Sequence, residues 1–212
     1  MDSSHWDERY AASDLVWSAT PNMWVEQLTA DLTPGTAVDL AGGEGRNALW
    51  LAERGWQATV VDFSQVALDR AQQWAAERLG ADAHRLRTEQ ADLLAYAPPA
   101  RAYDLVLVVY LQVPADQRRP VMRAAAEAVA PGGRLLIVAH DTENLSRGVG
   151  GPQAPEVLYS PADLLADLAG TGLTIDRAET VERPVQSEAG LRQALDALVV
   201  AIRPEAGGAG ER

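Results

Sequence analysis

A glycine-rich stretch between residues 36 and 48 constrains the fold of this chain more than any other feature. The run Thr36-Ala-Val-Asp-Leu-Ala-Gly-Gly-Glu-Gly-Arg-Asn-Ala48 has the pattern of a short apolar strand, a tight turn and the start of a helix. Glycines let the backbone turn sharply and approach a ligand closely, because they carry no Cβ atom. The N–H groups that open the following helix face whatever lies above the turn. The stretch therefore predicts a strand, turn and helix that together hold a cofactor.

Strand and helix patterns alternate along the chain from residue 36 to residue 139. The continuous apolar run at 103–110 is typical of a strand that is buried on both faces. The last two expected strands have no helix between them, which favours antiparallel pairing at the edge of the sheet. The sequence therefore predicts an α/β fold, a Rossmann-like, doubly wound and mostly parallel sheet. Beyond the opening strand, strands are expected at 56–62, 84–90, 103–110, 134–139, 173–182 and 196–203, and helices at 5–17, 23–32, 47–54, 64–79, 114–130 and 161–169.

The 212 residues are enough for one well-buried domain. No linker or internal repeat divides the chain, so residues 1–203 are expected to form a single domain, followed by a disordered tail at 204–212. Within the domain we expect an N-terminal helical lid at 1–32 and a cofactor-binding core at 36–140. The stretch 141–160 is expected to be a substrate loop, because such a long connection in a compact domain is usually functional.

Composition excludes several classes of function. The net charge of −12 argues against binding to nucleic acid, which needs a basic face. The absence of Cys excludes disulfides and thiolate metal sites. No apolar run is long enough to span a bilayer, and the first residues lack the apolar segment of a secretory signal. We therefore expect a cytoplasmic protein whose partner is a small molecule. If the protein forms a homodimer, the helix at 114–130 and the exposed sheet edge are the candidate surfaces.

Acidic residues lie near, at or just past the ends of three of the expected strands, at the edge where ligands bind in an open α/β sheet. Asp62 can accept hydrogen bonds from both hydroxyls of a ribose, or it is a strand-end acid facing water. Asp92 can accept from an adenine amino group, or cap a helix. Asp39 would repel a pyrophosphate but suits a cationic amino group. Residues 43–48 match the dinucleotide pattern G-x-G-x-x-G/A formally, but Asp39 and the lack of a second glycine turn argue against a dinucleotide.

Five segments, in order and spacing over residues 36–140, together resemble the class I S-adenosylmethionine-dependent methyltransferases. The Gly-Glu-Gly-Arg-Asn core and the Trp-bearing N-terminal helix are most similar to the small-molecule branch, near the tellurite-resistance and thiopurine methyltransferases. At Ala41-Gly42 the chain departs from the usual Gly-Cys or Gly-Ser pair, although both replacements are small. The segments are Val-Asp-Leu-Ala-Gly-Gly-Glu-Gly-Arg-Asn, Val-Val-Asp-Phe-Ser, Ala-Asp-Leu, Tyr-Asp-Leu-Val-Leu-Val and Pro-Gly-Gly-Arg-Leu-Leu-Ile-Val.

This resemblance implies a seven-stranded sheet with an antiparallel last strand, and S-adenosyl-L-methionine as the cofactor. It implies that the glycine turn contacts the methionine part, with Asp39 near the ammonium group, and that Asp62 holds the ribose. Trp17 and Arg46 are candidates for closing the site over the methionyl end. Phe63 would contact the adenine, Asp92 and Leu93 would frame its edge, and Val109 would lie under the sulfonium. The implied cofactor-binding residues are Trp17, Asp39, Ala41, Gly42, Gly43, Gly45, Arg46, Asp62, Phe63, Asp92, Leu93 and Val109.

His140 follows the strand expected at 134–139 and should point into the same cleft. Methylation of a hydroxyl needs a base, and a His with a pKa near neutrality is the usual choice. The alternative is a hydrogen-bonded loop His without a catalytic role. Asp141 is a candidate to orient the ring or to join a weak metal site, but one Asp beside one His is poor support for a metal, and none is predicted. Tyr110, Gln112 and Tyr159 are candidate contacts to the methyl acceptor.

The sequence thus predicts an O-methyltransferase that acts on a small hydroxylated molecule, such as a sugar or a phenol, with His140 as the general base. Two alternatives stay open. One is an S-, Se- or Te-methylating detoxification enzyme of the same fold, whose soft nucleophile needs no base. The other is a non-catalytic module that binds the cofactor.

Overall fold

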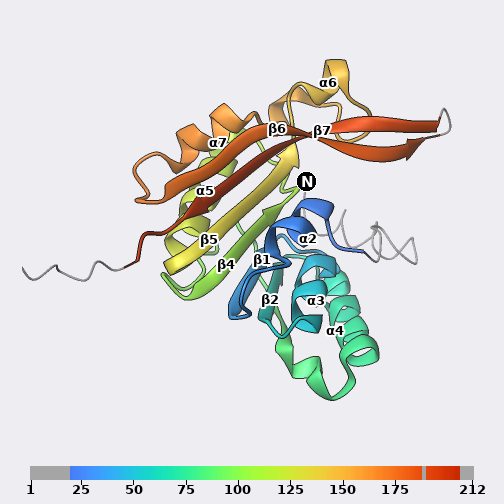
Figure 1. The fold of residues 1–212 in the computed structure, drawn as a ribbon, viewed down its shortest axis with the longest axis vertical. Coiled ribbons are helices and arrows are strands. Elements are labelled where there is room, and N and C mark those ends of the chain that lie inside the picture. Colours follow the sequence, from blue (N-terminus) through green and yellow to red (C-terminus); the bar gives the residue numbers. More distant parts are fainter. Residues whose placement is uncertain (1–19, 188–189, 206–212) are drawn as a thin grey trace, which may run out of the picture.

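The computed structural model describes residues 20–187 and 190–205. Its centre is a seven-stranded sheet in the order β3-β2-β1-β4-β5-β7-β6 (Figure 1). The first five strands pair parallel to one another, and β7 pairs antiparallel with both β5 and β6. This arrangement confirms the expected Rossmann-like α/β fold with an antiparallel last strand. The strands are β1 (Thr36–Leu40), β2 (Gln57–Asp62), β3 (Leu86–Gln90), β4 (Tyr103–Val109), β5 (Val129–His140), β6 (Thr174–Ser187) and β7 (Gly190–Ile202).

Helices cover both faces of the sheet (Figure 1). One face carries α2 (Met23–Thr29), α3 (Arg46–Glu53) and α4 (Gln65–Leu79), and the other carries α5 (Ala115–Ala128) and α7 (Pro161–Leu168). Short elements complete the described chain: α6 (Asn144–Arg147) and the 3-10 helices η1 (Gly80–Arg85) and η2 (Pro155–Val157). No helix within these described ranges has the length and apolar character needed to cross a bilayer.

The central strands are buried on both faces, as the continuous apolar run at 103–110 predicts. Successive side chains of a strand point to opposite faces of the sheet. On β4, Leu105 and Leu107 pack with the core on the α3 and α4 side, whereas Val106 and Val108 pack with the core on the α5 and α7 side. The two cores hold the carboxyl ends of the parallel strands at one edge of the sheet.

The expected end of α5 and the expected start of β5 were wrong. The helix ends at Ala128, and β5 begins at Val129, ahead of the Pro131-Gly132-Gly133 run that was expected to separate the two elements. Val129 has an extended backbone and already pairs with Tyr103 of β4. The register then shifts before the next pair, so the proline and glycines form an irregularity inside the strand instead of a loop.

The final hairpin is longer than the sequence predicts. β6 continues past residue 182 to Ser187, and β7 starts at Gly190 and not at residue 196. The extra residues pair with each other, and this two-stranded arm projects beyond the end of β5 (Figure 1). Because such a ribbon has little core of its own, its residues lack the apolar alternation on which strand prediction rests.

A buried ion pair fixes α7 against α5. The carboxylate of Asp167 is fully buried and accepts hydrogen bonds from Nε of Arg118, at 2.5 Å, and from Nε of Arg119, at 3.1 Å. Arg118 also lies over the ring of Tyr159, with 4.5 Å between its Cζ atom and the ring centroid. The charge of Arg118 is therefore satisfied on two sides inside the fold.

We expect Asp167→Ala to lower the free energy of unfolding by about 3–5 kcal/mol, because it leaves a buried guanidinium without its carboxylate. Urea unfolding followed by circular dichroism measures this loss. The matched control is Glu53→Ala, which removes a partly exposed ion pair with Arg78 and should cost less than about 1 kcal/mol. Equal losses of unfolding free energy in the two variants would contradict the conclusion that the Arg118–Asp167 pair is a buried, stabilising contact.

Candidate active site

The glycine turn between β1 and α3 has the conformation that only its small residues allow. Ala41, Gly43 and Gly45 all have positive φ angles, of 58°, 56° and 74°. Gly42 is restricted by space, since a Cβ atom there would lie 2.8 Å from Cγ1 of Val60. Ala41 adopts a conformation that costs an L-residue energy, as is frequent at functional sites. The turn thus exposes backbone without large side chains at the edge of the sheet where the parallel strands end.

Asp39 lies beneath this turn with a carboxylate that has no hydrogen-bond partner. The residue is 1% exposed, and neither carboxylate oxygen is paired. Burial raises the pKa of Asp39 to about 7, against the opposing effect of the Arg46 guanidinium. A Cβ atom on Gly42 would lie 3.0 Å from this carboxyl group, so the absent side chain leaves the approach open. An unpaired buried carboxylate of this kind suits a cationic ammonium group of a ligand.

Asp62 links the end of β2 to the glycine turn. Its Oδ2 accepts from the Gly43 N–H at 2.8 Å, and its Oδ1 accepts from the Ser64 N–H at 2.9 Å. Ser64 in turn caps the N-terminus of α4. Each carboxylate oxygen can accept a second hydrogen bond, so the side chain is held in place and keeps the capacity to accept from hydroxyl groups.

The other expected cofactor residues lie around the same edge, with one exception. Asp92 is exposed and accepts from the Leu94 N–H at 2.9 Å within a turn. No helix begins there in the described chain, so the alternative role of a helix cap is wrong. Leu93 packs partly into the core on the α5 side, and Val109 is 8% exposed at the end of β4. Phe63 follows β2 and is half-buried. Trp17 lies outside the described residues.

A hollow of about 320 Å³ opens beside the glycine turn. Its walls come from the segment before α2, from the first residue of α3, from the ends of β4 and β5, and from the hairpin. The wall residues are Thr20, Pro21, Asn22, Met23, Arg46, Tyr110, His140, Arg183 and Pro184. The structure therefore brings Arg46, Tyr110 and His140 together, three of the residues that the sequence nominates.

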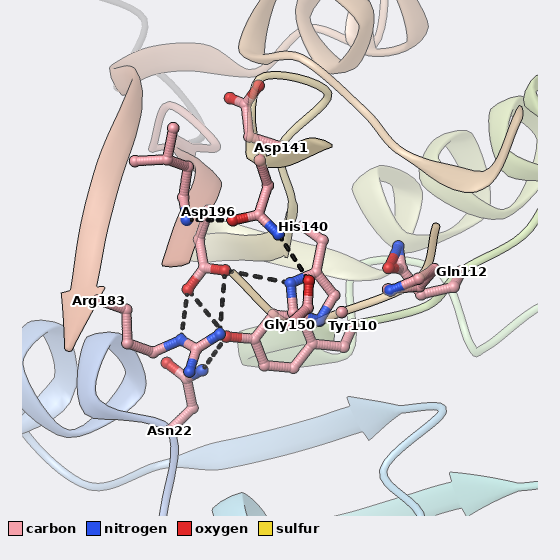
Figure 2. Close-up of polar contacts among 12 residues, drawn as sticks. Asn22, Tyr110, Gln112, His140, Asp141, Gly150, Arg183 and Asp196 are labelled. Atoms are coloured by element: carbon pink, nitrogen blue, oxygen red, sulfur yellow. Dashed lines mark hydrogen bonds and ion pairs between the residues drawn. The ribbon is translucent and has the colours of Figure 1, made fainter. Parts of the chain in front are cut away.

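His140 is held on three sides (Figure 2). Its ring stacks on Tyr110 with 4.5 Å between the centroids and 23° between the planes. Gly151 packs against the imidazole so closely that a Cβ atom there would lie 2.9 Å from Nδ1. Nδ1 is buried and lies 3.5 Å from Oδ1 of Asp196. Burial lowers the pKa of His140, with the Asp196 carboxylate opposing this shift and Arg183 adding to it. The lowered pKa favours the neutral imidazole at pH 7.

Asp196, Arg183 and Asn22 complete this polar cluster, and sequence reasoning missed all three (Figure 2). Asp196 is fully buried and accepts from Nε of Arg183, at 2.7 Å, and from the Tyr110 hydroxyl, at 2.8 Å. Asn22 donates to the same hydroxyl at 3.2 Å. Burial raises the pKa of Tyr110, so its hydroxyl stays protonated and donates. Two of the three lie on the hairpin whose length was underestimated, so a correct hairpin register is the signal that would have found them.

Two expected roles at the end of β5 need correction. Tyr159 was expected to contact the acceptor, but it is fully buried; its hydroxyl donates to the Leu111 carbonyl and accepts from the Val113 N–H. It supports the segment after β4 and does not line the hollow. Asp141 was a candidate to orient His140, but its carboxylate accepts from the Glu143 N–H and from the Thr180 hydroxyl, each at 2.8 Å.

Gln112, the third candidate contact to the acceptor, faces the segment that contains η2. Its Nε2 donates to the Val157 carbonyl at 2.9 Å, and its Oε1 is buried without a partner. Within the described ranges, His, Cys, Asp and Glu side chains form no group of three or more that could hold a metal ion.

Comparisons with known proteins identify the domain. Residues 37–133 match a family described as "Methyltransferase domain". A curated relative, the 2-heptyl-1-hydroxyquinolin-4(1H)-one methyltransferase of Mycobacteroides abscessus, is 25% identical over 120 residues, which are 56% of this chain and 52% of the relative. The chain thus spans about half the length of this relative.

Two solved structures have similar folds. One comes from work on the conversion of a disulfide bond into a thioacetal group during echinomycin biosynthesis, with a TM-score of 0.72, 22% identity, and coverage of 97% of this chain and 94% of the other. The second is the magnesium protoporphyrin IX methyltransferase of Synechocystis PCC 6803 with bound S-adenosylmethionine, with a TM-score of 0.64, 21% identity, and coverage of 85% and 76%.

The chain therefore contains a methyltransferase domain at residues 37–133. Its fold is similar to that of a solved methyltransferase that binds S-adenosylmethionine. The residues present fit that cofactor. The unpaired carboxylate of Asp39 matches the ammonium group of a methionine, and the bare backbone at Gly42 leaves room beside it. The backbone-anchored carboxylate of Asp62 keeps the capacity to accept from ribose hydroxyls.

We expect Asp39→Asn to stabilise the cofactor-free protein in alkaline solution and to weaken S-adenosylmethionine binding. The folded pKa is raised from 3.8 to about 7, so between these values the carboxyl ionises in the unfolded chain but not in the folded one, and the fold loses stability progressively as pH rises. At about pH 9 this cost reaches up to about 4 kcal/mol, and near pH 3 it vanishes. Thermal unfolding across this pH range and calorimetric titration with the cofactor measure the two effects.

The control for this prediction is Asp69→Asn on the exposed face of α4, which should change neither quantity. A variant at Asp39 that keeps both the wild-type melting temperature at about pH 9 and the wild-type affinity would contradict the assignment.

Proposed function

We propose that this protein transfers the methyl group of S-adenosylmethionine to a hydroxyl group of a small molecule, with His140 as the general base. The observation that carries the proposal is a neutral imidazole, held by stacking and burial, on the wall of a hollow beside the glycine turn. A neutral His at pH 7 can take a proton, whereas a protonated one cannot.

In this proposal the cofactor lies along the carboxyl edge of the sheet. The ammonium group of its methionine part lies by Asp39, the ribose hydroxyls donate to Asp62, and the adenine lies between Phe63 and Leu93. Val109 lies under the sulfonium, and Arg46 at the start of α3 faces the methionyl end. The bound cofactor supplies an electrophilic methyl group on a positively charged sulfur.

The acceptor hydroxyl then lies between that methyl group and His140. Its oxygen forms a bond to the methyl carbon as the carbon–sulfur bond breaks, and its proton passes to Nε2 of His140. The contribution of the protein is to align these atoms and to exclude water, which is the main source of acceleration in such a displacement. A base positioned for the proton contributes about 10²–10⁴-fold.

Two observations support a small polar acceptor. The hollow is bordered by hydrogen-bonding and charged side chains, among them Asn22, Arg46 and Arg183. The curated relative is named for 2-heptyl-1-hydroxyquinolin-4(1H)-one, whose ring hydroxyl supports a hydroxyl acceptor, whereas its heptyl chain is apolar. The net charge of −12 further favours a small molecule over nucleic acid.

The segment that precedes α2 bears on the expected N-terminal lid. Residues 20–23 border the hollow, and the Asn22 N–H is tied to Asn47 of α3 by a hydrogen bond of 2.9 Å. The first described residues of the lid expected at 1–32 therefore lie at the rim of the site.

We expect His140→Ala to lower kcat by about 10²–10⁴-fold while the affinity for S-adenosylmethionine stays the same. In the wild-type protein, kcat/KM should rise with pH through the folded pKa of His140, which burial lowers below 6.5. This acid limb should disappear in the variant. Initial rates across pH with a panel of hydroxyl acceptors measure both effects, and His84→Ala on η1, an exposed His, is the control.

Three results separate this proposal from its alternatives. A variant at His140 that retains most of kcat with a hydroxyl acceptor rules out the base. Turnover with thiol, selenide or telluride acceptors that is insensitive to the substitution indicates the soft-nucleophile enzyme. Cofactor binding without turnover of any acceptor indicates a non-catalytic module.

A further inference from the structure

A buried carboxylate on the last strand of the sheet contacts His140. Asp196 is fully buried, lies on β7 and faces three different elements. It accepts from Arg183 on β6 and from Tyr110 after β4, and it lies 3.5 Å from Nδ1 of His140 at the end of β5. A carboxylate this deep in the fold needs hydrogen-bond partners, and it has them.

The register of the sheet places Asp196 beside the ring. His140 and Asp196 are directly opposite in the antiparallel pairing of β5 with β7. Directly opposite residues of an antiparallel pair point to the same face of the sheet and have adjacent side chains. On the other flank, Arg183 pairs opposite Ala194, two residues from Asp196, and so reaches the same carboxylate diagonally.

The two oxygens of Asp196 have different surroundings. Oδ2 accepts the two short hydrogen bonds, at 2.7 Å from Nε of Arg183 and at 2.8 Å from the Tyr110 hydroxyl. Oδ1 has only longer contacts, at 3.4 Å to Nη2 of Arg183 and at 3.5 Å to Nδ1 of His140. Oδ1 can therefore accept a hydrogen bond from an N–H group of the imidazole. The ring nitrogen next to it is Nδ1, which has no other hydrogen-bond partner.

We propose that Asp196 is a positioning residue that holds His140 as the Nδ1–H tautomer, so that Nε2 is the unprotonated nitrogen available to an acceptor hydroxyl. The inference rests on the proposed role of His140. Tyr110 and Gly151 set the plane of the ring, as the stacking distance and the close backbone approach require. Stacking does not distinguish the two ring nitrogens. The carboxylate does, because it stabilises the tautomer whose proton is on the adjacent nitrogen, Nδ1.

Arg183 and Asp196 shift the pKa of the His140 imidazole in opposite directions. The charged and titratable groups around His140 are Asp196 from β7, Arg183 from β6 and the Tyr110 hydroxyl from the end of β4. The carboxylate raises the pKa of the imidazole and the guanidinium lowers it. Arg183 also orients Asp196, because its Nε and Nη2 both lie near the carboxylate.

The test is the tautomer of His140 in the full-length, cofactor-free protein, measured by nitrogen-15 NMR of the ring at about pH 8. The chain has three His residues, so His140→Ala assigns the signals. We expect mainly the Nδ1–H form in the wild type. In Asp196→Asn, the amide oxygen stays with the Arg183 and Tyr110 donors and the amide nitrogen faces Nδ1, which shifts the population toward the Nε2–H form.

Asp141→Asn is the matched control for this measurement. Asp141 adjoins His140 in the chain and is 1% exposed, but its carboxylate bonds to Glu143 and Thr180. The control should keep the wild-type tautomer and the wild-type rate.

Kinetics supply the second readout. Asp196→Asn should lower kcat by no more than the about 10²–10⁴-fold loss expected for His140→Ala, with the KM for S-adenosylmethionine unchanged. The acid limb of the pH profile should move to lower pH in Asp196→Asn and to higher pH in Arg183→Gln. A purely structural role would not produce shifts of opposite sign.

A wild-type tautomer in folded Asp196→Asn overturns the inference. Where that variant does not fold, an acid limb in Arg183→Gln that is unmoved or shifts to lower pH overturns it. A shifted tautomer with unchanged kcat supports the positioning role of Asp196 and contradicts the base role of His140, so the two failures are distinguishable.

Discussion

The insertion of β7 between β5 and β6 is the constraint on which the candidate site depends. Its antiparallel pairing runs along both neighbours and sets Asp196 opposite His140 while it brings Arg183 within reach of the same carboxylate. Because side chains alternate along a strand, a slip by one residue would turn Asp196 to the other face of the sheet. The apolar residues that follow it on β7 pack into both cores, and they fix the register that the polar cluster needs.

The site is built from buried charges that differ in how they are compensated. Asp196 has donors from two neighbours, and Asp62 has two backbone N–H groups. The carboxylate oxygens of Asp39 lack such partners, and burial raises its pKa to about 7. Burying an unpaired carboxyl costs stability, which is consistent with the proposed role of Asp39 beside the ammonium group of the cofactor. The glycine turn above it, which includes a non-glycine residue at positive φ, carries a similar cost.

Much of the fold could be predicted from the sequence, because the central strands are apolar throughout and the turns are marked by glycine. The errors lie where tertiary pairing overrides local pattern. Pro131-Gly132-Gly133 resembles a helix stop but lies inside β5, and the hairpin extends through polar residues. At the site, the strand-end positions of Asp39 and His140 follow from chain order, and their roles stay predictions. Asp196 could not be found without the register of β7. The sequence around Tyr159 did not indicate that its hydroxyl would bond to backbone groups and that the side chain would be buried.

The position of β7 also has a consequence for the order in which the molecule is assembled. It is the last described strand of the chain, yet it lies inside the sheet and not at its edge. During synthesis, the strand and the helix that flank the glycine turn emerge before β7, because the chain is made from its N-terminus. β6 can join β5 only through a strand that has not yet been made. The polar cluster around His140 therefore cannot be complete until β7 has emerged and paired with both of its neighbours.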